Sequence, residues 1–152
     1  MAALKKRRRM PIVGAVMTSF PYFVEAEDTA ATLERMMDEH GIRHLPVQEA
    51  GKVIGIVSER DLHHYVKREA SKVEKDKILA RHIMVPEPYI APFRAPLNEV
   101  VSEMAKRRIG SVIVQRQGKL AGILSAIDVC RILGEYLESM FPGGSRGGNT
   151  AA

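Results

Sequence analysis

The stretch GIRHLPVQEAGKVIGIVSERD, residues 41–61, recurs further along the chain as RIGSVIVQRQGKLAGILSAID, residues 108–128. The two copies align without insertion at a constant offset of 67 positions, which also brings Met17 onto Met84. The duplicated unit therefore spans most of the 152 residues, and one supersecondary unit occurs twice. The identical pairs include Gly51/Gly118, Lys52/Lys119, Gly55/Gly122, Ile56/Ile123, Ser58/Ser125 and Asp61/Asp128.

Each copy predicts a helix, then a hairpin, then a second helix. In the first copy Asp28 is suited to cap a helix that Gly41 ends in a left-handed conformation, and in the second copy Pro96 stands in the first helical turn. Short apolar strands on either side of Gly51 and Gly118 predict the hairpins. The residues expected on the core-facing sides of the helices are Ala30, Leu33, Met36, Met37, Leu62, Tyr65, Val66, Leu97, Val100, Val101, Met104, Ala105, Val129, Ile132 and Leu133.

The composition, 45% hydrophobic and 27% charged, is typical of a globular protein with one compact domain or two small domains that share a core. The net charge of +5 comes entirely from the basic run at residues 5–9, because the rest of the chain carries equal numbers of basic and acidic residues. Such a short arm is more typical of a solvated tail than of a nucleic-acid reader, which makes nucleic-acid binding a weak alternative. No apolar run approaches the roughly 18 residues that cross a bilayer, and no signal peptide is apparent, so we expect a cytoplasmic location without membrane insertion.

Catalytic and metal chemistry have little support in this sequence. The single cysteine, Cys130, excludes an intrachain disulfide, and its apolar neighbours predict a packed core thiol rather than a nucleophile. His40 and His44 are separated by Gly41, which interrupts the helix that their spacing would require, so no metal site is expected. Since no phosphate loop, nucleophile elbow or catalytic triad is apparent, we expect no enzyme and no catalytic cofactor.

The pattern Ser-x-x-Asp follows an apolar strand twice, at Ser58/Asp61 and at Ser125/Asp128. A serine at a helix N-cap with an acid three residues later forms a capping box, which would by itself explain both pairs. The same helix start also favours an anion, so that the serine could face a phosphate while the carboxylate accepts both hydroxyls of a ribose. The pattern therefore allows either a purely structural cap or a nucleotide site.

These residues resemble the cystathionine β-synthase (CBS) domain, which occurs in tandem pairs called Bateman modules. The first copy matches through Val16-Met17-Thr18, through 41–47 and through 55–62, and the second, looser copy matches through 83–85 and 109–114. The resemblance covers about residues 12–134 and implies a stand-alone CBS pair of bacterial or archaeal type. The implied fold is α/β (α+β), with two β-α-β-β-α units related by a pseudo-twofold axis.

From the composition and the repeat we expect a disordered basic tail at 1–10, one unit at 11–70, a linker at 71–79, a second unit at 80–141 and a disordered Gly-rich tail at 142–152. In CBS pairs, including those of the γ subunit of AMP-activated protein kinase, the matching positions bind adenine nucleotides between the units. The implied ligand here is AMP, ADP or ATP, with no turnover. The site residues carried over are Thr18, Ile42, Arg43, His44, Ser58, Asp61, Val85, Ile109, Gly110, Ser111, Ser125 and Asp128, and Arg60 lies beside the first of the two sites.

The resemblance also implies a homodimer and an effector enzyme or transporter that this chain does not contain. Two alternatives stay open: a ligand-free scaffold or oligomerisation module, and a sensor of S-adenosylmethionine. We further expect the two sites to differ in charge, because Gly110 and Ile127 in the second copy replace Arg43 and Arg60 in the first. His44 is expected to reach from the first unit toward the second site.

Overall fold

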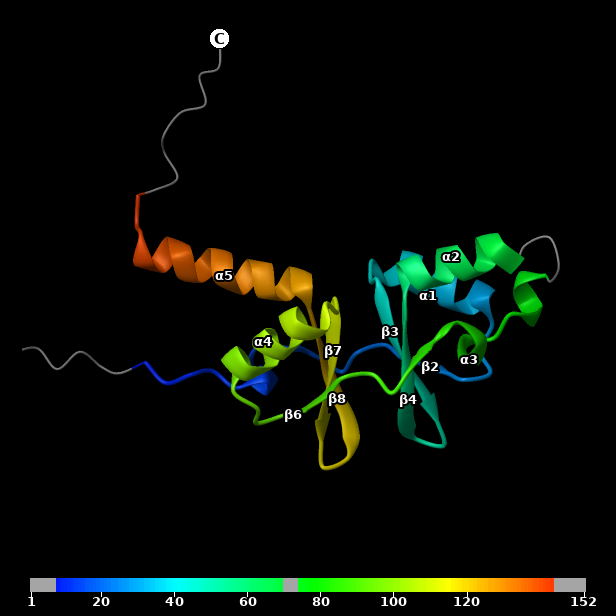
Figure 1. The fold of residues 1–152 in the computed structure, drawn as a ribbon, viewed down its shortest axis with the longest axis horizontal. Helices are drawn as coiled ribbons and strands as arrows, with labels where there is room; N and C mark the ends of the chain where they lie inside the picture. The colour runs from blue at the N-terminus through cyan, green and yellow to red at the C-terminus, as the bar shows by residue number, and fades with distance from the viewer. Residues whose placement is uncertain (1–7, 70–73, 144–152) are drawn as a thin grey trace, which may run out of the picture.

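Two antiparallel hairpins form the centres of the two halves of the molecule (Figure 1). The computed structural model describes residues 8–69 and 74–143, so the expected tails and linker fall partly outside the described residues. The first hairpin joins β3 (His44–Glu49) to β4 (Lys52–Ser58), and the second joins β7 (Ser111–Arg116) to β8 (Lys119–Ser125). Both turns use a glycine at positive φ, +76° at Gly51 and +74° at Gly118, as the hairpin signals predicted.

The helices that precede the hairpins form where the sequence indicated, although the N-terminus of each differs from the expectation. Helix α1 (Ala30–His40) ends at Gly41 with φ +61°, but its N-cap is Thr29, whose Oγ1 accepts from the Thr32 amide at 3.3 Å. Asp28, the expected cap, instead accepts a hydrogen bond from the Glu25 amide at 2.8 Å. Helix α4 (Leu97–Arg107) follows Pro96, which occupies the N-cap position rather than the first turn.

Each four-stranded sheet takes one strand from the other copy of the repeat. These strands, β1 and β5, lie in the segments with which the two copies begin, called the opening segments below. The first sheet has the order β2-β3-β4-β5 and the second the order β1-β8-β7-β6. In register, Thr18 of β1 lies opposite Ile123 of β8, and Val85 of β5 lies opposite Ile56 of β4. The remaining elements are η1 (Val13–Ala15), β1 (Thr18–Ser19), β2 (Val24–Glu25), α2 (Glu59–Glu69), η2 (Lys75–Lys77), α3 (Ala80–Ile83), β5 (Val85–Pro86), β6 (Ile90–Pro92) and α5 (Ala126–Met140).

Two glycines permit this exchange of strands. A Cβ at Gly55 would meet the Met84 side chain, and a Cβ at Gly122 would meet the Met17 side chain and, at 2.7 Å, the backbone oxygen of Thr18. The opening segments can therefore lie on the hairpins only where the hairpins lack a side chain. The mixed α+β fold, with two sheets and five α-helices among the described residues, confirms the predicted fold class.

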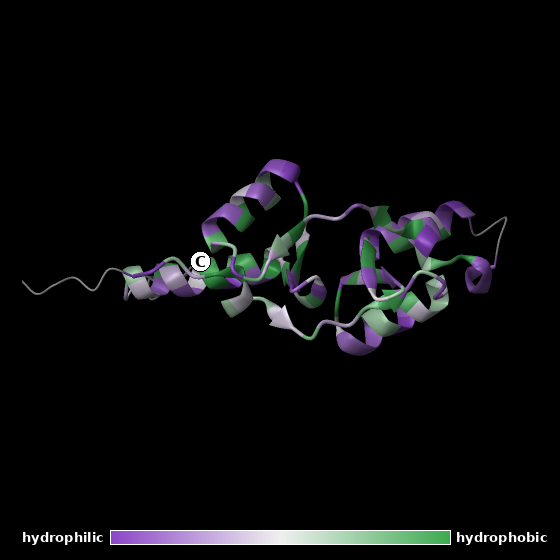
Figure 2. Cartoon of the chain, turned by 90° about the horizontal axis from the view of Figure 1, so that it is seen from below, coloured by the Kyte–Doolittle hydropathy of each residue, from purple (hydrophilic) through white to green (hydrophobic). Residues whose placement is uncertain are grey.

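Each half has its own hydrophobic core, drawn from both copies of the repeat. Val13 is fully buried among β7, β8 and α4 residues of the second half, whereas Ile78 and Ala80 are buried against the first half. Figure 2 shows the strands as mostly hydrophobic and the helices as alternately hydrophobic and hydrophilic. The repeated sequence unit and the packed unit consequently have different boundaries.

Three of the expected core residues are exposed, and all of them lie on the two helices of the second half. Cys130 and Leu133 of α5 and Ala105 of α4 face solvent, which corrects their assignment to the core. Helix α5 packs against the core of the second half through Val129 and Ile132. The opposite side of α5 remains uncovered in the single chain.

Candidate functional site

Ser58 and Asp61 form a closed capping box at the start of α2. Ser58 Oγ donates to Asp61 Oδ2 at 2.6 Å and accepts from the Asp61 amide at 3.1 Å. The Ser58 amide completes the box by donating to Asp61 Oδ2 at 3.3 Å. Both hydrogen bonds to the carboxylate use Oδ2, so Asp61 Oδ1 takes no part in the box.

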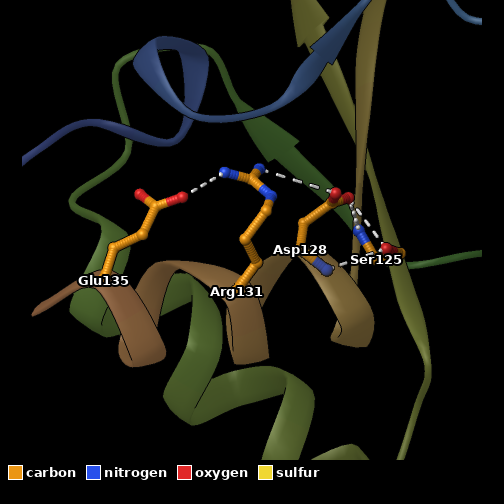
Figure 3. A network of polar contacts seen from close by, with 4 residues as sticks. All are labelled: Ser125, Asp128, Arg131 and Glu135. Carbon is orange, nitrogen blue, oxygen red and sulfur yellow. Dashed lines mark hydrogen bonds and ion pairs between the residues drawn. The ribbon is translucent and has the colours of Figure 1, made fainter. Parts of the chain in front are cut away.

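Ser125 and Asp128 repeat this box at the start of α5 (Figure 3). Ser125 Oγ donates to Asp128 Oδ2 at 2.8 Å and accepts from the Asp128 amide at 3.2 Å, and the Ser125 amide donates to the same carboxylate oxygen at 2.9 Å. Asp128 Oδ1 lies 3.8 Å from Arg131, whose guanidinium also donates to Glu135 at 3.1 Å. The sequence analysis did not single out Arg131, although its place three residues after Asp128 put both on one side of a helix.

The residue before each hairpin is bound to the helix start by its backbone. The Glu59 amide donates to the Arg43 carbonyl and the Ala126 amide to the Gly110 carbonyl, each at 2.8 Å. The Arg43 side chain is 3.7 Å from Glu59 and mostly exposed, whereas Gly110 offers no side chain. The first site therefore has an arginine where the second has Gly110. Arg131 adds a positive charge to the second site and so makes the charges of the two sites more alike.

His44 lies at the seam between the two halves. It starts β3 opposite Ser58, and a Cβ placed on Gly110 would lie 3.4 Å from its Nε2 atom. Burial lowers the pKa of His44, with a smaller lowering by Arg43, while the carboxylates of Asp61 and Glu59 act in the raising direction. The imidazole thus lies beside Gly110 of the second copy, whose carbonyl accepts from the Ala126 amide at the start of α5.

Thr18 and Val85 each lie beside the hairpin of the copy to which they do not belong. Thr18 is paired with the β8 strand that ends at Ser125, and Val85 is paired with the β4 strand that ends at Ser58. Sequence analysis named both residues but could not show this exchange, because strand pairing across the repeat leaves no local signal.

The other predicted residues divide between surface and core. Ile42 and Ile109 pack against the two hydrophobic cores, and Ser111 is buried opposite Ser125 in the second hairpin. Arg60 is exposed on α2. The structure brings together Arg43, His44, Ser58 and Asp61 near one helix start, and Gly110, Ser111, Ser125 and Asp128 near the other.

Within the described part of the chain, no three His, Cys, Asp or Glu side chains cluster as metal ligands would. Among the same residues, no helix combines the length and apolarity that a membrane span requires.

Comparison with known proteins shows the family of this chain. A family model described as the CBS domain matches residues 13–68 and 80–135. An inosine-5'-monophosphate dehydrogenase of Korarchaeum cryptofilum is 32% identical over 85% of this chain and 25% of its own length. The chain spans about a quarter of the length of the dehydrogenases that it matches.

Two solved structures share the fold. A proposed acetoin utilization protein (AcuB) from Vibrio cholerae superimposes with a TM-score of 0.75 at 28% identity, covering 87% of this chain and 96% of that one. CBSX2, solved in complex with AMP, gives a TM-score of 0.68 at 21% identity over 83% of this chain and 98% of its own. With two matched repeats that follow the duplicated sequence and the two hairpin–helix units, the chain belongs to the CBS domain family.

Proposed function

We propose that this chain is a regulatory module that binds an adenine nucleotide, AMP, ADP or ATP, at the starts of α2 and α5 without turning it over. The observation that carries the proposal is the doubled Ser-x-x-Asp box, in which Asp61 Oδ1 lies outside the capping hydrogen bonds. A ribose diol can bind such a carboxylate oxygen, and a phosphate is favoured by the amides and dipole of a helix start. The AMP complex of the structurally similar CBSX2 supports this ligand class.

The proposed ligand arrangement uses residues from both copies at each site. The first site combines Arg43, Ser58 and Asp61 with the β5 segment that contains Val85, and the second combines Ser125 and Asp128 with the β1 segment that contains Thr18. A ligand at either site would hold the strand from one copy, β5 or β1, against the hairpin and helix of the other copy. We infer that this change is what an effector enzyme or transporter recognises.

Isothermal titration calorimetry of the full chain against AMP, ADP, ATP, S-adenosylmethionine and NAD tests the proposal. We expect an adenine nucleotide to bind and to raise the melting temperature, because a ligand of the native state alone stabilises it by mass action. Asp61→Asn and Asp128→Asn should each weaken binding, whereas Asp38→Asn, an exposed acid on α1, serves as the matched control. Absence of both heat and thermal shift with every adenosyl compound at millimolar concentration would favour the scaffold function.

The scaffold function is the second candidate, and the uncovered side of α5 favours it. Ile127, Leu133, Leu137 and Met140 on this helix are between 45% and 71% exposed. At the matching positions of α2, Ile127 corresponds to the charged Arg60 and Leu133 to Val66, which packs against the first core. The described residues of α2 therefore do not repeat the exposed apolar surface of α5. We therefore propose a homodimer in which two copies pack through α5, with or without a nucleotide. S-adenosylmethionine is the alternative ligand.

A further inference from the structure

A groove with a volume of about 440 Å³ lies between the turns of the two hairpins. Both turns point away from α2 and α5, so the groove is at the opposite end of the hairpins from Ser58 and Ser125 (Figure 1). One wall is the segment that crosses from the second sheet to the first. The lining residues are Phe20, Pro21, Phe23, Gln48, Gly51, Lys119 and Leu120.

Phe20 is an unusual residue for its position. Its side chain is 95% exposed, and its backbone has φ +50°, a left-handed conformation that aromatic residues seldom adopt. The equivalent residue of the second copy, Glu87, has nearly the same φ of +51°. The fold thus requires this backbone turn in both copies, but it does not require a phenyl ring in the solvent. An exposed aromatic at the rim of an apolar groove is typical of a contact surface.

Gln48 places an amide at the same groove. Its side chain is only 9% exposed, and none of the hydrogen bonds within the described residues uses its amide group. In that part of the chain, every side-chain nitrogen or oxygen that is fully buried has a hydrogen-bond partner. Since the Gln48 amide has none, it must be in contact with solvent. It therefore offers one donor and one acceptor to whatever fills the groove.

Lys119 adds a positive charge to the lining. Its counterpart in the repeat, Lys52, stands in the other turn and does not line the groove. The groove consequently combines apolar walls, an amide with free hydrogen-bonding capacity and one ammonium group. This set is complementary to an extended peptide that presents an apolar side chain, a backbone amide and a carboxylate.

We propose that this groove is a docking site for an acidic peptide segment of a partner protein that also presents an apolar side chain. The apolar side chain of the segment packs against Phe20, Phe23 and Leu120, its backbone amide pairs with Gln48, and its carboxylate binds Lys119. The site is separate from the proposed nucleotide sites and does not depend on them. It would give the module a contact surface at the end of the molecule away from α5.

Titration of the 15N-labelled full chain with acetyl-Asp-Leu-Phe-Asp-amide tests this proposal by NMR. We expect saturable shifts of the amides at residues 20–23, 48–51 and 118–120. Acetyl-Asp-Ser-Ser-Asp-amide, which lacks the apolar side chains, and acetyl-Lys-Leu-Phe-Lys-amide, which has the opposite charge, should each bind about tenfold more weakly. Equal binding of the three peptides, or the absence of shifts at these amides, would refute the site.

Two variants separate binding from folding. Lys119→Glu should weaken the acidic peptide about tenfold, whereas Lys52→Glu makes the same change of charge in the other turn and should leave its affinity nearly unchanged. Phe20→Asn should abolish the shifts yet raise the melting temperature, because asparagine tolerates a positive φ and does not expose an apolar ring. If Lys52→Glu weakens the peptide as much as Lys119→Glu does, or if AMP displaces the peptide, the peptide site is wrong.

Discussion

His44 is the residue whose ionisation is most directly connected to the seam between the two units. Its pKa is lowered in the folded chain from the ordinary value of 6.5, chiefly by burial. The unfolded chain therefore binds a proton at this residue more readily than the folded chain. The contribution of His44 to the free energy of unfolding is present above pH 6.5 and is lost as the pH falls below that value.

We expect the melting temperature of the natural chain to fall more steeply between pH 7 and pH 5 than that of His44→Gln. The exposed His64 on α2 provides the control, and His64→Gln should keep the slope of the natural chain. Thermal unfolding followed by circular dichroism at a series of pH values measures both slopes. An unchanged slope in His44→Gln would mean that its burial has no effect on proton binding.

Arg43 distinguishes the first proposed nucleotide site from the second. Its contact with Glu59 is long, 3.7 Å, and its side chain is 76% exposed, so it is available to a phosphate. Arg131 at the second site is already bound to Glu135 at 3.1 Å. Charge-assisted hydrogen bonds contribute about 1.5–3 kcal/mol, which corresponds to at least about tenfold in affinity.

On this basis ATP and ADP should prefer the first site, and the second should tolerate AMP better. Arg43→Ala should weaken ATP more than AMP, and Asp61→Ala should reduce ATP affinity more than Asp128→Ala. Calorimetric titration of each variant with both nucleotides decides the matter. Equal losses of ATP affinity in the two aspartate variants would contradict a difference between the sites.

At the scale of elements, the exchanged strands depend on the lack of a side chain at two glycines. A methyl group at Gly122 would meet the Thr18 backbone of β1, whereas the three atoms nearest to a methyl group at Gly55 all belong to the Met84 side chain. Gly122→Ala should therefore destabilise the fold by about 1–3 kcal/mol, and Gly55→Ala by less.

Gly134, inside α5, is the matched control for these substitutions. A Cβ there meets no atom within 4 Å, and Gly134→Ala should stabilise the chain by about 0.5–1 kcal/mol through its helix propensity. Urea denaturation of the three variants gives the free energies of unfolding. A loss of stability at Gly134 equal to that at Gly122 would show that strand contact is not the cause.

At the scale of the whole molecule, the uncovered side of α5 determines assembly. Leu137 and Met140 are 45% and 49% exposed, and a charge between two such surfaces would be costly to bury. We expect static light scattering at tens of micromolar to give a dimer for the natural chain and a monomer for Leu137→Asp. Ser139→Asp, on the other side of the same helix, should remain dimeric, and a monomeric natural chain would contradict the proposal.

The sequence determined most of the local structure of this protein. The repeated glycines located both hairpin turns, Gly41 ended the first helix, and Ser-x-x-Asp located both capping boxes. These features depend on backbone conformations and hydrogen bonds within a few residues, which a local pattern encodes directly. The family resemblance, confirmed over residues 13–68 and 80–135, followed from the same pattern.

Only the tertiary structure decided how the two copies combine. Nothing local distinguishes a Thr18 strand paired within its own copy from one paired with β8, because both pairings satisfy the same backbone groups. The exposure of Cys130 and Leu133, the contact of His44 with Gly110 and the groove beneath Phe20 all depend on that packing. An apolar residue in the sequence indicates that a surface should be buried, but which surface covers it is determined by contacts between segments far apart in the chain.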